Sequence, residues 1–279
     1  MDVKSENSHD PTKHPHKRFS SDILLKLYGI DVGAAAASSA MVAPFIAVVD
    51  RSIIENLNGK RALMTGLKEG LKTVFTQPHR FVATPQFQLV FGLYFSTYIT
   101  ANLVDTTCEQ HSVETGKAAM LKFMATSTVN MLLCIYKDRS FTRMFGASTT
   151  RKLPFLSYLL FAARDSMTIA ASFTAPVYFA SKLQEYNIVG SAKSAGVTAQ
   201  LICPASVQFL STPLHLYALD LYNRPSVTGG QRVSLIRKEY FKSTLARCAR
   251  IGPAFGIGGV GNTFARSIRN QVIHPAATA

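Results

Sequence analysis

Mostly apolar stretches alternate with strongly polar ones along the whole chain. Six charge-poor segments run near residues 28–49, 82–104, 117–136, 154–180, 194–219 and 248–268. A helix needs about 20 residues to cross the hydrocarbon core of a bilayer, and each segment is at least that long. The pattern therefore predicts an all-α membrane protein with six transmembrane helices in a domain spanning residues 28–270.

The two ends of the chain lack this pattern. Residues 1–27 mix charged residues, proline and histidine with few apolar residues, which is typical of a disordered tail. They contain neither the apolar core of a secretory signal nor the acid-poor composition of a mitochondrial presequence. Residues 271–279 are expected to form a short C-terminal tail.

Small residues interrupt several of the apolar segments. GAAAASSA begins at Gly33, AKSAG begins at Ala192 and GIGGVG begins at Gly256. The last motif has no strand before it and no acidic partner about 20 residues later, so it does not match a dinucleotide-binding fingerprint. Small residues allow helices to approach closely, and we expect that role for all three motifs.

The composition of the chain lies between that of a soluble enzyme and that of a membrane bundle whose helices are uniformly apolar. Charged residues make up 16% of the chain and apolar residues 47%, whereas soluble domains carry about 25% charged residues. The four cysteines stand far apart, at positions 108, 134, 203 and 248. Their spacing predicts no metal site, and we expect no cofactor and no enzymatic activity.

The positive charge lies in three alternate loops. Residues 51–80, 137–152 and 224–250 contain 18 of the 30 Lys and Arg residues and only four acids, so these loops hold the whole formal net charge of +14. If the intervening segments cross a membrane in turn, all three loops lie on one side, as the positive-inside rule predicts. A soluble basic protein that binds nucleic acid is the competing interpretation, but it requires no such alternation. We expect no nucleic-acid partner.

Short motifs recur in phase with these loops. Helix starts with proline follow each loop, in RFVATPQF from Arg80, RKLPFL from Arg151 and RIGPAF from Arg250. The apolar segments before these loops end in VVDRSI, YKDRSF and ALDLYNR. Each ending contains one Asp at the point where the helix would leave the membrane. The recurrence predicts repeats over about residues 28–104, 117–180 and 190–268.

This threefold pattern resembles the mitochondrial carrier family. The family's odd helices end in PxDxxK, and here Pro44 and Pro213 lie near the ends of odd segments, while EGLKTVF from Glu69 matches part of the family's loop motif. No repeat has an intact PxDxxK, because Ile53, Phe141 and Asn223 stand where a cation would follow each Asp. The resemblance implies three pseudo-symmetric two-helix repeats around a central cavity.

The resemblance also implies candidate site residues. A gate would pair the exit carboxylates with nearby arginines, and a further carboxylate would lie on the opposite side, with Arg266 as its partner. The gate candidates are Asp50, Arg51, Asp138, Arg139, Asp220, Arg224 and Asp165. The substrate-binding candidates are Arg151, Arg247 and Arg250, since guanidinium groups suit carboxylates and phosphates.

Two functions follow from the resemblance. The first is a transporter of a small anionic metabolite in the mitochondrial inner membrane, working by alternating access, with the lipid bilayer, including cardiolipin, as its other partner. The second is a carrier-fold scaffold or insertion protein that no longer transports, in a mitochondrial membrane such as the outer one. The broken PxDxxK motifs and the short middle loop favour the second.

Overall fold

The computed structural model describes residues 19–146, 152–173 and 175–273, and in these ranges all regular structure is helical. The elements in order are α1 (Ser21–Leu57), α2 (Leu63–Thr76), α3 (Pro78–Val82), α4 (Pro85–Gln110), α5 (Thr115–Phe145), α6 (Phe155–Phe173), α7 (Ala175–Glu185), α8 (Ala192–Asn223), α9 (Gly229–Ala249), the π-helix η1 (Gly252–Gly259), α10 (Val260–Arg266) and α11 (Arg269–Ile273). The prediction of an all-α protein is confirmed for the described part of the chain.

The helices extend into both predicted tails. Helix α1 begins at Ser21, within the segment 1–27 that was expected to be disordered. At the other end, α11 reaches Ile273. Residues 1–18 and 274–279 lie outside the described part of the chain.

Three helices are long and apolar enough to cross a membrane, namely α1, α4 and α5. Helix α1 spans 37 residues and α5 spans 31, which exceeds the length that a bilayer requires. The structure thus supports several membrane-spanning helices. It does not establish six equivalent spans in three repeats.

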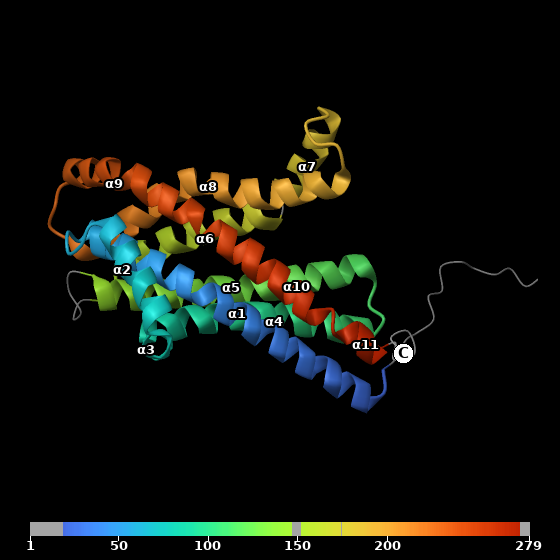
Figure 1. The fold of residues 1–279 in the computed structure, drawn as a ribbon. Coiled ribbons are helices and arrows are strands. Elements are labelled where there is room, and N and C mark those ends of the chain that lie inside the picture. The colour runs from blue at the N-terminus through green and yellow to red at the C-terminus, as the bar shows by residue number, and fades with distance from the viewer. Residues whose placement is uncertain (1–18, 147–151, 174, 274–279) are drawn as a thin grey trace, which may run out of the picture.

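The long helices lie side by side (Figure 1). Helix α1 packs along α4 and is also covered by η1 and α10, while α4 packs along α5. Helix α8 contacts α6, α7 and α9, and α7 projects away from the other helices in Figure 1. Apolar side chains from several helices, including Ile46, Phe87, Phe141 and Leu219, form the core that holds them together.

Two glycines allow α2 to lie directly against α1. A Cβ atom on Gly70 would lie 2.5 Å from Val48 Cγ1, and one on Gly66 would lie 2.9 Å from Ser52 Oγ. Real Cβ atoms do not approach so closely, so larger residues here would push the two helices apart. This contact fixes the first basic loop against the end of α1.

The basic segments gather at one end of the molecule. Helices α2 and α3 and the start of α9 lie together in Figure 1, opposite the start of α1 and the end of α11. Long-range hydrogen bonds tie this end together, from Asn56 Nδ2 to Glu239 (2.5 Å) and from Lys60 Nζ to the Gly146 carbonyl (2.7 Å). We call it the basic end. The opposite end is called the terminal end, since it contains the first residues of α1 together with α11.

Candidate functional site

A cavity of about 450 Å³ runs between α4, α5, α6 and the segment Arg250–Gly259. Along α5 its lining extends from Cys134, towards the basic end, to Ala119, a distance of about 22 Å at the helical rise per residue. Much of its lining is apolar, with Tyr94, Asn130 and Thr168 among the polar side chains. A largely apolar cavity with a few convergent polar groups is the usual form of a small-molecule site.

A buried network of charges lies at the basic end of the cavity, where two of its members, Asp165 and Arg250, are part of the lining. Lys137 on α5 contacts both Asp50 on α1 and its own neighbour Asp138, the latter at 3.0 Å. Arg250, at the end of α9, donates to Asp50 at 2.7 Å. The carboxylates and cations of this part of the network therefore join α1, α5 and α9.

Arg164 continues the network into α6. Its Nη2 lies 2.5 Å from both Asp138 and Asp165, its Nη1 lies 2.9 Å from His215 Nδ1, and its side chain is 2% exposed. We call Asp50, Lys137, Asp138, Arg164, Asp165 and Arg250 the basic-end network. Its three carboxylates and three cations balance, which is the condition under which buried charges are tolerated.

A second network lies towards the terminal end. Arg266 on α10 donates to Asp31 on α1 at 2.7 Å and to Asp105 on α4 at 3.1 Å. Lys122 on α5 contacts Asp105 at 2.6 Å, and Thr106 donates to Asp31 at 2.5 Å. These residues form the terminal-end network, which joins α1, α4, α5 and α10. Lys122 also lines the cavity, so charged networks are found towards both of its ends.

Three polar atoms on the cavity wall lack partners. Asp165 Oδ2, Thr126 Oγ1 and Ser127 Oγ are buried and have no hydrogen-bond partner in the described part of the chain, and all three residues line the cavity. Buried polar groups in folded proteins nearly always have a partner. A polar ligand in the cavity would reach these atoms once their side chains rotate towards it.

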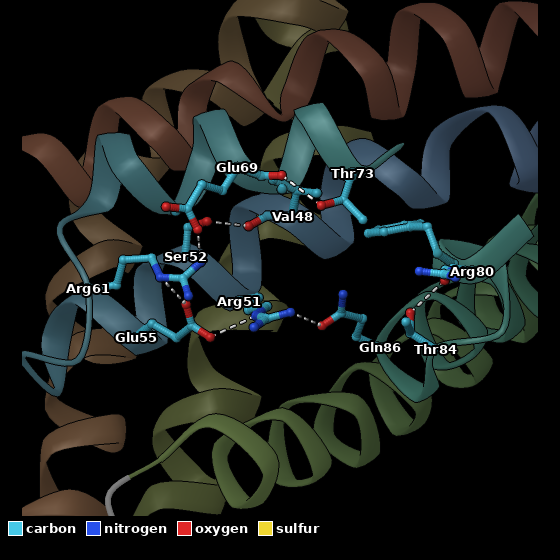
Figure 2. Close-up of a pocket in the computed structure, with 13 residues that line it drawn as sticks. Val48, Arg51, Ser52, Glu55, Arg61, Glu69, Thr73, Arg80, Thr84 and Gln86 are labelled. Atoms are coloured by element: carbon cyan, nitrogen blue, oxygen red, sulfur yellow. Dashed lines mark hydrogen bonds and ion pairs between the residues drawn. The ribbon is translucent and has the colours of Figure 1, made fainter. Parts of the chain in front are cut away.

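A smaller hollow of about 210 Å³ lies at the basic end between α1, α2, α3 and α4. Figure 2 shows Arg51 between Glu55 and Gln86, with hydrogen bonds of 2.7 and 3.2 Å. Arg61 contacts Glu69 across the same hollow at 2.6 Å. Arg51, Arg61, Glu55 and Glu69 are thus paired with one another, while Arg80 donates to Gln77 at 3.2 Å. These contacts brace the basic end.

The structure corrects two of the three predicted gate pairs. Asp50 bonds to Lys137 and Arg250, whereas Arg51 turns to Glu55. Likewise Asp138 contacts Lys137 and Arg164, while Arg139 is exposed. The partners of both carboxylates include cations on other helices, which the spacing along the chain does not reveal.

The third pair is present. Asp220 and Arg224 are one helical turn apart, and their side chains lie 2.6 Å from each other. Arg232 on α9 also contacts Asp220, at 2.7 Å. This cluster lies at the basic end and outside the cavity lining, where it ties α8 to the start of α9.

The predicted substrate-binding arginines have different positions. Arg250 lines the cavity. Arg247 is 1% exposed and lies away from the lining, where it donates to Gln208 on α8 at 2.8 Å. Arg151 lies outside the described residues. Asp165 lines the cavity, but its expected partner Arg266 belongs to the terminal-end network.

Lys137, Asp31 and Asn130 are not among the residues that the sequence pattern singled out. Asp31 lies within a predicted apolar segment, where a lone charge is costly and marks a functional position, so this signal could have revealed it. Asn130 also lies within such a segment and donates to Thr97 at 3.2 Å across the cavity wall. The described residues contain no group of His, Cys, Asp and Glu side chains that could hold a metal ion.

Comparison with known proteins gives the family. Residues 34–269 match the model of a family described as "probable citrulline exporter". The match covers most of the chain, so the chain belongs to this family. No curated protein and no solved structure matches it significantly. Together with the apolar helices, this identifies a multi-pass membrane protein with a transport function.

The match overturns the assignment to the mitochondrial carrier family, for which no match is found. The Asp-Arg repeats that suggested it do not form equivalent pairs, because only Asp220 contacts the arginine that follows it. The expected mitochondrial location depended on that resemblance, and nothing in the match places the chain in mitochondria.

Proposed function

We propose that the chain exports a small amino acid, citrulline in the first instance, through the cavity between α4, α5, α6 and η1. The observation that carries this proposal is the cavity of about 450 Å³ that ends at a buried, balanced charge network. Its volume falls within the range of about 300–1,000 Å³ typical of small-molecule sites. The description of the family supplies the substrate.

The two networks suit an alternating-access cycle. The basic-end network joins α1, α5, α6 and α9 by side-chain contacts alone, as a closed gate does. The terminal-end network joins α1, α4, α5 and α10 in the same way. Breaking one network while keeping the other would open the cavity to one side at a time.

We further propose six membrane crossings, although their assignment to three equivalent repeats is not part of the proposal. Helices α1, α4 and α5 meet the length and hydropathy expected of spans. Helix α6, helix α8 and the run of α9, η1 and α10 lie alongside them (Figure 1), while α7 follows α6 and projects away. Their polar residues include Arg164 and Arg247, which are buried between helices and need not face lipid.

The proposed substrate is an amino acid and no longer the anionic metabolite that was expected from the sequence. Citrulline carries a carboxylate, so the guanidinium of Arg250 serves it as it would serve an anion. It also carries an ammonium group, for which an anion-only site would have no partner. The cavity provides a carboxylate for that group in Asp165.

Counterflow tests the proposal. Purified protein is reconstituted into liposomes loaded with unlabelled citrulline, and the entry of labelled citrulline is followed. We expect saturable accumulation well above that of protein-free liposomes, and a large loss in Arg250→Ala. The matched control is Arg139→Ala, which removes an exposed arginine at the same end and should transport normally.

The contrary result is equally clear. If folded protein at a verified density accumulates no citrulline and no other labelled amino acid, the transport proposal is wrong. The scaffold interpretation would then be preferred, and crosslinking in the native membrane would be the way to find its partners. If Arg139→Ala loses as much activity as Arg250→Ala, the cavity is not the route.

A further inference from the structure

The cavity holds three charged side chains, and their arrangement bears on which amino acid it can bind. Arg250 and Asp165 lie at the basic end of the lining, while Lys122 lies towards the terminal end. Asp165 is the only carboxylate among the described residues that line the cavity. A ligand that carries an ammonium group and a carboxylate close together therefore finds both an anionic and a cationic partner only at the basic end of the cavity.

Arg250 retains donors for a carboxylate. A guanidinium has five N–H donors, and one of them, on Nη1, is committed to Asp50. The side chain of Arg250 is 16% exposed and is part of the cavity lining. The neutralising contact with Asp50 also holds the guanidinium in place for a paired hydrogen bond.

Asp165 has an unused acceptor beside the cavity, which a rotation of its carboxylate would turn towards an ammonium group. Its Oδ1 accepts from Arg164 Nε at 3.0 Å and from Arg164 Nη2 at 2.5 Å. Its Oδ2 is buried and has no partner in the described part of the chain, although the residue lines the cavity. The unused oxygen of a buried carboxylate is a strong acceptor that lacks its donor.

Neutral polar groups follow along α5. Asn130 lies one turn from Cys134, and Thr126 and Ser127 lie one turn further towards the terminal end. The hydroxyls of Thr126 and Ser127 have no hydrogen-bond partner among the described residues. A neutral side chain that both donates and accepts would satisfy these groups, as a ureido or carboxamide group does.

From these contacts we infer that the cavity binds a zwitterionic amino acid with its head group between Arg250 and Asp165 and its neutral polar side chain against Thr126, Ser127 and Asn130. This inference rests on the proposed transport function and adds the orientation and the selectivity of the site. Cationic amino acids such as ornithine are rejected. Once Asp165 holds the α-ammonium group, the described lining offers no second carboxylate, and a buried cation without a partner is costly.

Thermal stabilisation in detergent tests binding apart from transport. We expect citrulline to raise the melting temperature of the wild-type protein. N-acetylcitrulline lacks the ammonium group, and norvaline lacks the ureido group. Ornithine carries a second ammonium group in place of the ureido group. Each of these three should bind at least about tenfold more weakly than citrulline. The loss of a hydrogen bond to a charged group, or a buried polar group left without a partner, lowers affinity by about that factor.

Variants show which residues produce the preference for citrulline over each of the other ligands. Asp165→Asn should remove most of the preference for citrulline over N-acetylcitrulline. The double variant Thr126→Val, Ser127→Ala should remove most of the preference over norvaline and leave the preference over N-acetylcitrulline intact. Thr263→Val is the matched control, because this threonine is exposed and lies outside the lining. It should bind like the wild type.

The outcomes separate this inference from the transport proposal. Equal stabilisation of the wild type by citrulline, N-acetylcitrulline and ornithine overturns the orientation, whether or not citrulline is transported. Selective stabilisation without counterflow supports the binding site and overturns the transport proposal. Absence of both overturns both. The comparison of ligands needs only the wild-type protein, so a variant that fails to fold does not prevent the test.

Discussion

Arg250 donates a 2.7 Å hydrogen bond to Asp50, which lies 200 residues earlier in the chain. The same carboxylate contacts Lys137 on α5, so one aspartate joins the first long helix to two later elements. Its side chain is 9% exposed. This arrangement places a fully compensated carboxylate where three parts of the chain meet at the end of the cavity.

Removing the charge of Asp50 should destabilise the protein strongly. In Asp50→Asn, Arg250 loses its ion pair and the buried Lys137 keeps only its contact with Asp138. Breaking a buried pair in this way costs about 3–5 kcal/mol, and we expect a loss of that order in the free energy of unfolding. Thermal or denaturant unfolding in detergent measures it.

Two controls accompany that measurement. Asp22→Asn changes an exposed acid at the start of the same helix and should shift stability by no more than about 0.5 kcal/mol. The double variant Asp50→Asn, Lys137→Met restores the balance of charge, with Asp138 still paired to Arg164, and should recover part of the loss. An Asp50→Asn protein as stable as the wild type would mean that these contacts do not hold the helices together.

The sequence predicts the importance of Asp50 and Asp138 better than it predicts their partners. A carboxylate at the exit of an apolar segment is visible in the sequence because charge is rare there. The contact between Asp50 and Lys137 depends on how α1 packs against α5 across 87 residues, and no local pattern encodes it. Local geometry does predict the pair Asp220 and Arg224, since residues four apart on a helix face each other.

The helices themselves are largely predictable. The six apolar segments lie within α1, α4, α5, the α6–α7 pair, α8 and the run from α9 to α10, apart from a few residues at their ends. The π-helix η1 is not predictable from hydropathy, because its departure from α-helical geometry leaves the apolar pattern unchanged. Short π-helical segments are common at functional sites, and this one lines the cavity at Ala254 and Gly259.

Two neighbouring glycines of η1 should respond in opposite ways to alanine. A Cβ on Gly258 would lie 2.1 Å from Tyr98 Oη, whereas a Cβ on Gly259 meets nothing within 4 Å. Gly258→Ala should therefore reduce the free energy of unfolding by about 1–3 kcal/mol through overpacking. Gly259→Ala should be neutral or stabilising by up to about 1 kcal/mol, as expected of glycine replaced in a helix.

Unfolding of the two single variants under identical conditions decides the matter. Equal effects at both positions would contradict the close approach of η1 to α4. Tyr98 also donates to the Ala254 carbonyl at 3.1 Å, a bond that Tyr98→Phe loses. Relief of the 2.1 Å contact should outweigh that loss, so Tyr98→Phe combined with Gly258→Ala should be less destabilised than Gly258→Ala alone. The phenyl ring has no hydroxyl to collide with the new methyl group.

Both ends of the chain should face the same side of the membrane. The start of α1 and α11 lie at the terminal end, and Arg269 on α11 contacts Glu109 at the end of α4. The loop 58–62 lies at the basic end. Tags at both termini should therefore be digested from one face of sealed vesicles, and a protease site inserted at residues 58–62 only from the other. Termini on opposite faces would contradict six crossings.

The transport route can be tested at Cys134, which lines the cavity one turn from Asn130. In a variant that keeps only this cysteine, a small thiol reagent should block citrulline efflux from proteoliposomes, and saturating citrulline should slow the labelling several-fold. When Cys134→Ser is added to that variant, the reagent should leave citrulline efflux unchanged. Undiminished efflux after complete labelling of Cys134 would show that the substrate does not pass through this cavity.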